Sequence, residues 1–379
     1  MPLVDYRITR FQFARDRIVG DSQVRASHVH VATLELIDSE GHVGLGFAQS
    51  LFHPLPSEEE LIRTFDEEVW PNLKGQPAIA LAHQVKRPRG GHLNRSTHPF
   101  GEAIQHALWD VAAKAANLPL WKMLGAKRSK VRAYASGLDY HLSDDVFCSL
   151  FTQAADQGYT GFKIKVGAPE IERDIHRLDL LKQAIGPNAK IMIDANEAWS
   201  PKEAIQNLDT IRRAGHEIYW LEDPILRFDI EGLKLLRETA GNTLINSGEY
   251  LDVSGKRALI QAHATDMLNV HGHFTDVMRI GWLAADMGVP ITVGNTFLEL
   301  GVNVALALPE VEWLEYSFQN FEHLVETPYK IEDGFIYGSE TPGHGLVLCE
   351  DARQAYRQPI IIDNTQLGPA PAQQRLALK

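Results

Sequence analysis

Three acidic residues follow one another at nearly constant spacing in the middle of the sequence. Asp194, Glu222 and Glu249 lie 28 and 27 residues apart, and each comes after a short apolar run. Carboxylates held close together repel one another unless a cation lies between them. Mg²⁺ accepts such oxygen ligands and keeps other positions for water or substrate oxygens. We therefore predict that these acids bind one Mg²⁺ ion per subunit. The alternative is three separate acids that each begin a surface loop.

Two lysines in the segment GFKIKVG, residues 161–167, raise a similar question about charged residues held close together. Lys163 and Lys165 alternate with apolar residues, which is the period of a β-strand. On an exposed strand both ammonium groups would be solvated. In a strand covered on both faces they would be buried side by side, which is costly without anionic partners or a function. A lysine beside another cation and a metal ion is expected to have a lowered pKa, so that it can act as a base near neutral pH.

The elements that must position these residues form a series of eight apolar runs. The runs alternate with amphipathic segments and start 22 to 31 residues apart, about the length of a strand and its crossover helix. This pattern predicts an α/β fold with a (β/α)₈-type barrel over residues 128–320, whose chemistry lies at the C-terminal ends of the strands. The expected strands are 131–136, 162–166, 190–194, 217–222, 244–249, 266–270, 290–294 and 312–316.

The first 127 residues show strands followed by helices, which predicts an α+β unit. A β-hairpin is expected over 28–50, and helices over 57–73, with Ser57 as N-cap and Pro71 as a stop, and over 100–124. The segments that flank the hairpin, 17–25 and 50–57, are loop-like. Residues 321–379 again show strands and turns, and we expect them to return to the N-terminal unit.

Composition and charge exclude several classes of protein. The chain has 379 residues, 44% hydrophobic and 23% charged, which is typical of a soluble globular protein. A formal net charge of -12 argues against a nucleic-acid partner, and no apolar run is long enough to span a membrane. The N-terminus lacks the apolar core of a signal peptide. With only Cys148 and Cys349, a cytoplasmic location is the simplest expectation.

Four motifs, FKIKV, IMIDANEAW, WLEDP and NSGEYL, occur in this order along the chain. Together they resemble the enolase superfamily, in its mandelate racemase-like (mandelate racemase/muconate lactonizing enzyme) branch. The resemblance covers nearly the whole chain. It implies a modified TIM barrel over residues 128–320 and an α+β capping domain over residues 1–127, which the C-terminal segment 321–379 completes.

The resemblance also implies roles for individual residues. Asp194, Glu222 and Glu249 would be the metal ligands, Lys165 the catalytic base, and Lys163 would lie beside the substrate carboxylate. In this family a base removes the proton α to a carboxylate, and Mg²⁺ holds the enediolate that forms.

The sequence departs from the family pattern on the opposite face of the site. Racemase-like members carry a His after the seventh strand, oriented by an Asp after the sixth. Here Gly294 and Asn295 stand where the His is expected, and His271 stands where the Asp is expected. The lysine that cycloisomerases and dipeptide epimerases carry after the sixth strand is also missing. His271 is the best candidate for a catalytic group on this face, with His273 second.

One well-equipped face favours elimination over racemisation, because a two-base proton transfer needs acid/base groups on both faces. We expect a hydro-lyase that dehydrates an acid sugar to a 2-keto-3-deoxy acid, working as a homo-oligomer on a small carboxylate substrate. A racemase, epimerase or lactone cycloisomerase on the same scaffold is the first alternative, and a catalytically silent ligand-binding barrel is the second. The expected substrate contacts are Asn196, Glu315, Asn295, Ser22, Arg25, His53 and His273.

Overall fold

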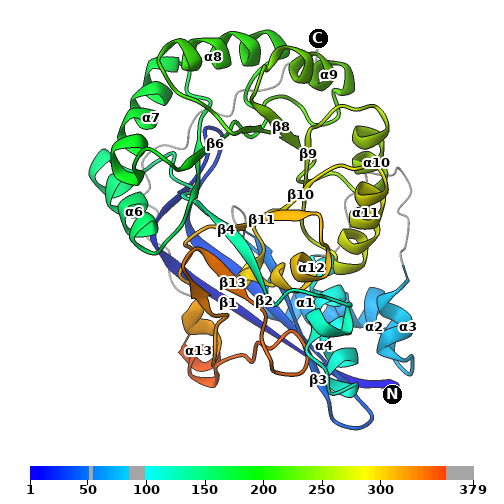
Figure 1. Cartoon of the computed structure of the whole chain (residues 1–379). Coiled ribbons are helices and arrows are strands. Elements are labelled where there is room, and N and C mark those ends of the chain that lie inside the picture. The colour runs from blue at the N-terminus through cyan, green and yellow to red at the C-terminus, as the bar shows by residue number, and fades with distance from the viewer. Residues whose placement is uncertain (51–53, 85–98, 356–379) are drawn as a thin grey trace.

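The structure, a computed structural model, describes residues 1–50, 54–84 and 99–355 (Figure 1). Eight parallel strands form a closed barrel, because the eighth strand pairs with the first, Leu314 opposite Ala133. The predicted barrel is therefore confirmed. Its strands are β4 Lys130–Ser136, β5 Gly161–Lys165, β6 Lys190–Asp194, β7 Trp220–Glu222, β8 Leu244–Ser247, β9 Met267–Val270, β10 Ile291–Val293 and β11 Val311–Tyr316.

One helix follows each of the first seven barrel strands, and the larger of these helices surround the ring (Figure 1). They are α6 Asp144–Asp156, α7 Ile171–Ile185, α8 Pro201–Arg213, α9 Ile230–Thr239, α10 Val253–Gln261, α11 Phe274–Asp286 and α12 Val302–Ala307. Within the described residues, β11 is followed only by the 3₁₀ turn Glu322–Leu324 before the chain leaves the barrel. The eighth βα unit is therefore incomplete, as in a modified barrel.

Side-chain caps define where several of these helices begin. Ser200 precedes α8 and forms a capping box, because its Oγ accepts from the Glu203 backbone N–H at 3.3 Å while Glu203 accepts from the Ser200 N–H at 2.8 Å. Asp229 and Asp252 cap α9 and α10 with single hydrogen bonds, because their carboxylates accept from the backbone N–H groups of Gly232 and Gly255. Each cap sits in the loop that follows a barrel strand, so it also limits the conformation of the loops that carry the polar residues.

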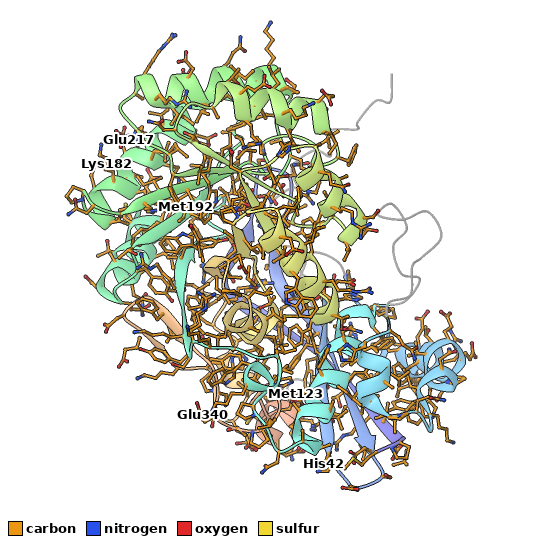
Figure 2. All side chains as sticks on the ribbon, turned by 45° about the vertical axis from the view of Figure 1, so that its right-hand side comes forward. His42, Met123, Lys182, Met192, Glu217 and Glu340 are labelled. Carbon is orange, nitrogen blue, oxygen red and sulfur yellow. The ribbon has the colours of Figure 1, made fainter. Side chains whose placement is uncertain are left out.

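Side chains that point into the barrel form two layers. One end is filled by a buried apolar cluster, in which Figure 2 labels Met192 among the barrel strands; its members are Tyr134, Met192, Trp220, Met267 and Trp313. Two positions farther along the same strands are Ser136, Asp194, Glu222, Asn269 and Glu315. Because side chains two residues apart share a face of a strand, the apolar layer supports a polar layer at the C-terminal ends. We call this end the barrel mouth.

The N-terminal sheet has one more strand than the sequence predicted. Its three antiparallel strands are β1 Leu3–Gly20, β2 Arg25–Asp38 and β3 Val43–Ser50. The expected hairpin is formed by β2 and β3. The loop expected over 17–25 is wrong, because β1 continues to Gly20 and pairs with β2 on both sides of an irregularity between Ala14 and Val19. Only residues 21–24 form the turn.

The predicted helix over 57–73 contains a local widening. It consists of α1 Glu58–Thr64, a π-helical turn over Phe65–Val69 and α2 Trp70–Leu73, with Ser57 as N-cap as expected. Pro71 does not stop the helix. It lies in the first turn of α2, directly after the π-helical turn, where a missing N–H is tolerated. The short helix α3 Ala78–Ala82 follows.

The single helix expected over 100–124 is two helices. They are α4 Gly101–Ala115 and α5 Leu120–Met123. Asn117 takes a positive φ of 52° between them, and Pro119 precedes α5. A residue in the left-handed region ends a helix. The apolar periodicity of the sequence continues across this break and therefore does not reveal it.

The C-terminal segment contacts both the barrel and the N-terminal sheet. Its hairpin, β12 Ile331–Glu332 and β13 Phe335–Tyr337, pairs with β4 of the barrel. Farther on, the His344 backbone N–H donates to Asp110 Oδ1 on α4 at 2.8 Å, and Arg353 on α13 Glu350–Ala355 pairs with Glu35 on β2. No helix in the described ranges has the length and apolar character needed to cross a membrane.

Candidate active site

Lys163 and Lys165 point to the same face of β5 and share one carboxylate. Asp194 Oδ2 lies 2.6 Å from Lys165 Nζ and 3.4 Å from Lys163 Nζ. Lys163 Nζ also lies 2.6 Å from Glu222 Oε1 and 3.2 Å from Glu315 Oε1. Lys163 is 1% exposed and Lys165 is 6% exposed. The two ammonium groups are thus buried side by side with three anionic partners, which resolves the question that the segment GFKIKVG posed.

These carboxylates set the pKa of both lysines. Burial lowers the pKa of Lys165, but attraction to Asp194, Glu315 and Glu249 together outweighs burial and raises the pKa above its ordinary value. Burial likewise lowers the pKa of Lys163, and Glu222 and Glu315 raise it further than burial lowers it. Among the protein groups alone, the acids thus outweigh the neighbouring cation. The lowered lysine pKa expected from the sequence requires a metal ion among these acids and stays a prediction.

Glu222 is held by more donors than the sequence suggested. Besides Lys163, the indole Nε1 of Trp220 donates to its Oε2 at 3.1 Å. Asn269 Nδ2 donates to its Oε1 at 3.0 Å, and Asn246 Nδ2 donates to its Oε2 at 3.4 Å. Hydrogen bonds from several donors fix the orientation of this carboxylate, while burial raises the pKa of Glu222 well above its ordinary value, with Lys163 opposing the shift. Four donors on four strands, β5, β7, β8 and β9, therefore define the position of this acid.

Glu249 lies in the loop after β8, since this strand ends at Ser247. Lys256 on α10 holds the loop by donating to the backbone oxygens of Gly248 at 2.5 Å, Glu249 at 3.2 Å and Leu251. The Glu249 carboxylate itself makes no hydrogen bond or ion pair within the described part of the chain. Burial raises its pKa to about 7, with Arg227 opposing and Asp194 adding to the shift. Additional positive charge near Glu249 would therefore be electrostatically favourable.

The predicted metal ligands surround one region without converging on a point. Among the described residues, no group of three or more His, Cys, Asp or Glu side chains is placed so that it could hold a metal ion. The carboxylates of Asp194 and Glu222 point toward the two lysines and not toward each other. The donor set fits a hard divalent cation in its chemistry, because it consists of carboxylate oxygens from three consecutive βα units. The uncompensated carboxylate of Glu249 fits the same cation.

Glu315 and Asn295 come together at the mouth. Glu315 is the last interior-facing residue of β11, and its Oε2 accepts from the Asn295 backbone N–H at 2.7 Å. Burial raises the pKa of Glu315, but Lys163 and Lys165 outweigh this and lower it. A Cβ at Gly294 would lie 2.6 Å from Asn269 Oδ1, so the backbone at this position leaves no room for a larger residue. The packing around position 294 therefore agrees with a glycine, and not a histidine, at this place in the sequence.

The side chains of His271 and His273 lie in different surroundings. The His271 ring packs edge-on against Tyr250, with ring centroids 5.3 Å apart, and its Nε2 is buried without a hydrogen-bond partner. Burial lowers the pKa of His271. The His273 side chain is 42% exposed and lies 4.0 Å from Asp276 on α11. His271 is therefore the better placed of the two for a role inside the mouth.

The turn between β1 and β2 lies on the barrel mouth. Gln23 Nε2 donates to the Asn196 backbone oxygen at 2.6 Å, and Asn196 Oδ1 accepts from Lys165 Nζ at 2.8 Å. Ser22 Oγ is buried without a partner and lies 3.1 Å from the place a Cβ on Gly167 would take. The turn thus approaches Lys165 through Asn196.

The other two predicted contacts from the N-terminal unit are Arg25 and His53. Arg25 begins β2 opposite Gly20, and its side chain makes no contact with the site that the described residues reveal. His53 lies outside the described residues. Both stay predictions.

Sequence reasoning missed several polar neighbours of the site. Tyr134 OH accepts from Lys163 Nζ at 3.3 Å, and Asn246 and Asn269 donate to Glu222. The period-2 rule could have found all three, because each occupies an interior-facing position of its strand. Arg227, which lies 3.0 Å from both Glu197 and Asp223, had no such signal, because it is in a loop.

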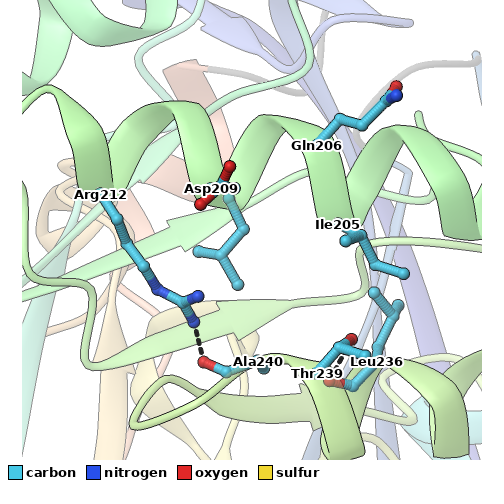
Figure 3. A pocket seen from close by; sticks show the side chains of 8 residues that line it. Ile205, Gln206, Asp209, Arg212, Leu236, Thr239 and Ala240 are labelled. Atoms are coloured by element: carbon cyan, nitrogen blue, oxygen red, sulfur yellow. Dashed lines mark hydrogen bonds between the residues drawn. The ribbon is translucent and has the colours of Figure 1, made fainter.

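A cavity of about 210 Å³ lies elsewhere, between α8 and α9 (Figure 3). Its lining mixes apolar side chains with Asp209 and Arg212, and Arg212 donates to the backbone oxygen of Ala240. None of the predicted site residues lines it. The chemistry predicted from the sequence therefore belongs to the barrel mouth and not to this cavity.

Comparison with known families agrees with this geometry. Residues 19–125 match the mandelate racemase/muconate lactonizing enzyme N-terminal domain, and residues 149–352 match the enolase C-terminal domain-like family. A crystal structure from Mesorhizobium loti, given the provisional name mandelate racemase, is 59% identical with a TM-score of 0.92, and the match covers 99% of this chain and 100% of that one.

Characterised relatives catalyse more than one reaction. The L-talarate/galactarate dehydratase of Salmonella typhimurium is 29% identical over 89% of this chain and 85% of its own length. A 3,6-anhydro-alpha-L-galactonate cycloisomerase of Streptomyces coelicolor is 26% identical over 83% and 88%. The Salmonella enzyme has also been solved with Mg and L-lyxarohydroxamate, at 26% identity, a TM-score of 0.79 and 93% coverage of both chains.

Proposed function

Because this chain belongs to the mandelate racemase/muconate lactonizing enzyme family of the enolase superfamily, we propose that it dehydrates an acid sugar to a 2-keto-3-deoxy acid. What supports the proposal is the buried lysine pair of β5, surrounded by carboxylates at the barrel mouth and facing a side without the family's histidine at position 294. The dehydratases among its relatives support the same class of reaction.

In this proposal Lys165 takes the proton from the carbon α to the substrate carboxylate. It is the lysine nearer the mouth, and its partners are Asp194 and Asn196. The bond electrons form a double bond between the α and β carbons as the β-hydroxyl leaves. The hydroxyl takes up a proton and departs as water, and the enol product rearranges to the 2-keto acid.

Lys163 would stabilise negative charge on the substrate carboxylate. It lies deeper than Lys165 and is held by Glu222, Glu315 and Tyr134. A fixed cation in a water-excluded site stabilises developing charge more strongly than the same cation in water. His271, on the other side of the mouth, would donate the proton to the leaving hydroxyl.

Asp194, Glu222 and Glu249 would hold one Mg²⁺ ion. When bound, Mg²⁺ would supply positive charge that offsets these carboxylates and the substrate carboxylate, which favours both the neutral amine of Lys165 and the loss of the α-proton. The substrate would enter over Asn196 and the turn of residues 21–24, where Ser22 is a candidate contact.

A single screen tests this function. The protein with Mg²⁺ is incubated with a panel of mono- and diacid sugars and their lactones, and semicarbazide detects 2-keto-3-deoxy products. The same panel in D₂O reports α-proton exchange. Exchange with inversion and no keto product would assign a racemase or epimerase. Conversion of a lactone without a keto product would assign a cycloisomerase, and binding without exchange would assign a silent barrel.

A further inference from the structure

The loop after β9 lies against the first turn of α4, which comes from the N-terminal unit. Gly272 takes a φ of 95° between the two histidines of this loop, and a Cβ there would lie 3.1 Å from Glu102 Oε1. Next to Glu102, a Cβ on Gly101 would lie 3.1 Å from His273 Nε2. Two glycines, one on each side, thus let the loop and the helix approach closely. The approach brings a carboxylate to the loop that carries His271.

Within the described ranges, neither functional group at this contact has a hydrogen-bond partner. The Glu102 carboxylate makes no hydrogen bond or ion pair within the described residues. The Nε2 atom of His271 is buried and has no hydrogen-bond partner. Buried polar atoms in native proteins are nearly always paired. An unpaired carboxylate and an unpaired imidazole on opposite sides of one close contact are complementary in charge and in hydrogen bonding.

We propose that Glu102 is a positioning residue for His271, and that these two side chains, which the structure brings near each other but not within ion-pair distance, join as a carboxylate–imidazole pair assembled from the N-terminal unit and the barrel. The pair would fix the tautomer and orientation of His271 and stabilise its protonated form, which is the form that donates a proton to a leaving group. The proposal rests on the proposed function in one respect, namely that His271 acts in the mouth opposite Lys165.

Electrostatics around His271 agree with this pairing. Burial lowers the pKa of His271 most, and Glu102 is the strongest charge acting in the opposite direction. Lys256 on α10 and Arg227 in the β7–α9 loop lower the pKa further, while Glu315 on β11 raises it. Without Glu102, the imidazole would face two cations and one acid with a weaker effect, and it would lose its proton more readily.

Other histidines at the same contact are competitors for Glu102. His106 lies one turn along α4 from Glu102 and packs against Phe274, with ring centroids 4.6 Å apart. Burial lowers its pKa to about 4, so it is neutral at physiological pH. His273 is partly exposed and lies near Asp276. Neither combines burial with a position inside the mouth, so His271 is the partner we assign.

The decisive experiment is an NMR titration of the histidine imidazoles in the full-length protein. His271 is identified by the signal that His271→Asn removes. Glu102→Gln should lower the His271 pKa, Glu102→Asp should retain most of the wild-type value, and Glu59→Gln, a change at an exposed acid on α1, should leave it unchanged. An unchanged His271 pKa in Glu102→Gln, or a shift confined to His106 or His273, would overturn the proposal.

Kinetics on whichever acid sugar the screen identifies give a second readout. Glu102→Gln should reduce kcat/KM for elimination by about 10²-fold. In the pH profile of kcat/KM, the limb that reports the catalytic acid should move to lower pH. α-Deuterium exchange, which depends on Lys165, and Mg²⁺ affinity measured by calorimetry should both persist. Equal losses of exchange and elimination would count against a role through His271. The NMR arm needs no substrate, so a failure of the proposed function leaves the pairing testable.

Discussion

At the residue scale, the site is governed by the balance between two buried lysines and the acids around them. Lys163 contacts three carboxylates, whereas Lys165 contacts Asp194 and the amide oxygen of Asn196. Removing one partner of a buried ion pair leaves an uncompensated charge, which is more costly than losing a solvated one. The two lysines should therefore respond differently to the same substitution.

We expect Lys165→Met to stop α-deuterium exchange while substrate and Mg²⁺ still bind. Lys163→Met should lower kcat/KM by several orders of magnitude and also destabilise the protein by about 3–5 kcal/mol, because three carboxylates lose their shared cation. Exchange in D₂O measures the first effect, and urea unfolding measures the second. Wild-type exchange by the Lys165→Met protein would show that Lys165 is not the base.

The acids proposed as metal ligands should likewise separate into two kinds. Asp194→Asn and Glu249→Gln should both weaken Mg²⁺ binding in calorimetry at least tenfold, since each removes an anionic ligand. Asp194→Asn should also lower stability, because two buried ammonium groups lose a partner. Glu249→Gln should not, because its carboxylate has no partner in the described residues. Mg²⁺ binding by either variant at wild-type affinity would exclude that residue as a ligand.

At the element scale, short loops at the ends of strands decide which side chains reach the mouth. β8 and β10 are shorter than their apolar runs, so Glu249 and Gly294 lie in loops. Lys256 then holds the Glu249 loop through backbone oxygens, and Asn269 packs against the backbone at Gly294. The loop after β10 continues with Leu298 and Glu299, which take positive φ values of 52° and 55°. Non-glycine residues in this region are strained and are held by their surroundings.

The acid at the end of this loop should make stability depend on pH. Burial, together with the nearby Glu322, raises the pKa of Glu299 to about 8. The unfolded pKa is about 4.3, so the folded protein holds this proton more tightly and loses stability as pH rises from about 4.3 to about 8. Glu299→Gln should therefore be more stable than wild type at pH 9, and the difference should disappear near pH 4. Melting temperatures across this range test it, with Glu67→Gln, a change at an exposed acid, as control. A difference that does not vary with pH would contradict the assignment.

At the scale of the whole molecule, the C-terminal segment ties the N-terminal sheet to the barrel. Arg353 lies on the last described helix, and its guanidinium reaches Glu35 on β2 and Thr9 on β1. Asp110 on α4 accepts from the backbone N–H groups of Leu45 and His344 and pairs with Lys114. These buried contacts join segments from both ends of the chain. The turn of residues 21–24, which lies on the mouth, is held in place by the sheet that they support.

Arg353→Met should accordingly loosen the whole assembly without touching the site. Glu35 would keep Arg7 as a partner, so we expect a loss of about 1.5–3 kcal/mol, the contribution of hydrogen bonds to a charged group. Urea unfolding measures this loss, and calorimetry should give an unchanged Mg²⁺ affinity. Lys330→Met, at an exposed pair with Glu332, is the matched control and should cost far less. Equal losses of stability in the two variants would show that the buried Arg353–Glu35 pair does not hold the C-terminal segment to the N-terminal sheet.

Much of this architecture follows from local pattern in the sequence. Eight apolar runs at a regular spacing determine the barrel, because a strand and its crossover helix need a nearly constant length. Period-2 alternation determines that Lys163 and Lys165 share a face, and the same rule places Asp194, Glu222 and Glu315 in one layer. The motifs around these residues were sufficient to identify the family. Each of these features depends on neighbours within a few residues or on simple spacing.

Only the tertiary structure decided the features that depend on contacts between distant segments. Strand β1, the break between α4 and α5, and the loop position of Glu249 result from packing and backbone conformation that periodicity does not encode. The raised pKa of the lysines follows from which acids they meet, and the sequence shows only that acids are present. The approach of Glu102 to the His271 loop joins the N-terminal unit to the sixth barrel strand. Such contacts depend on the fold as a whole, because the residues that make them meet only after every intervening element has been placed.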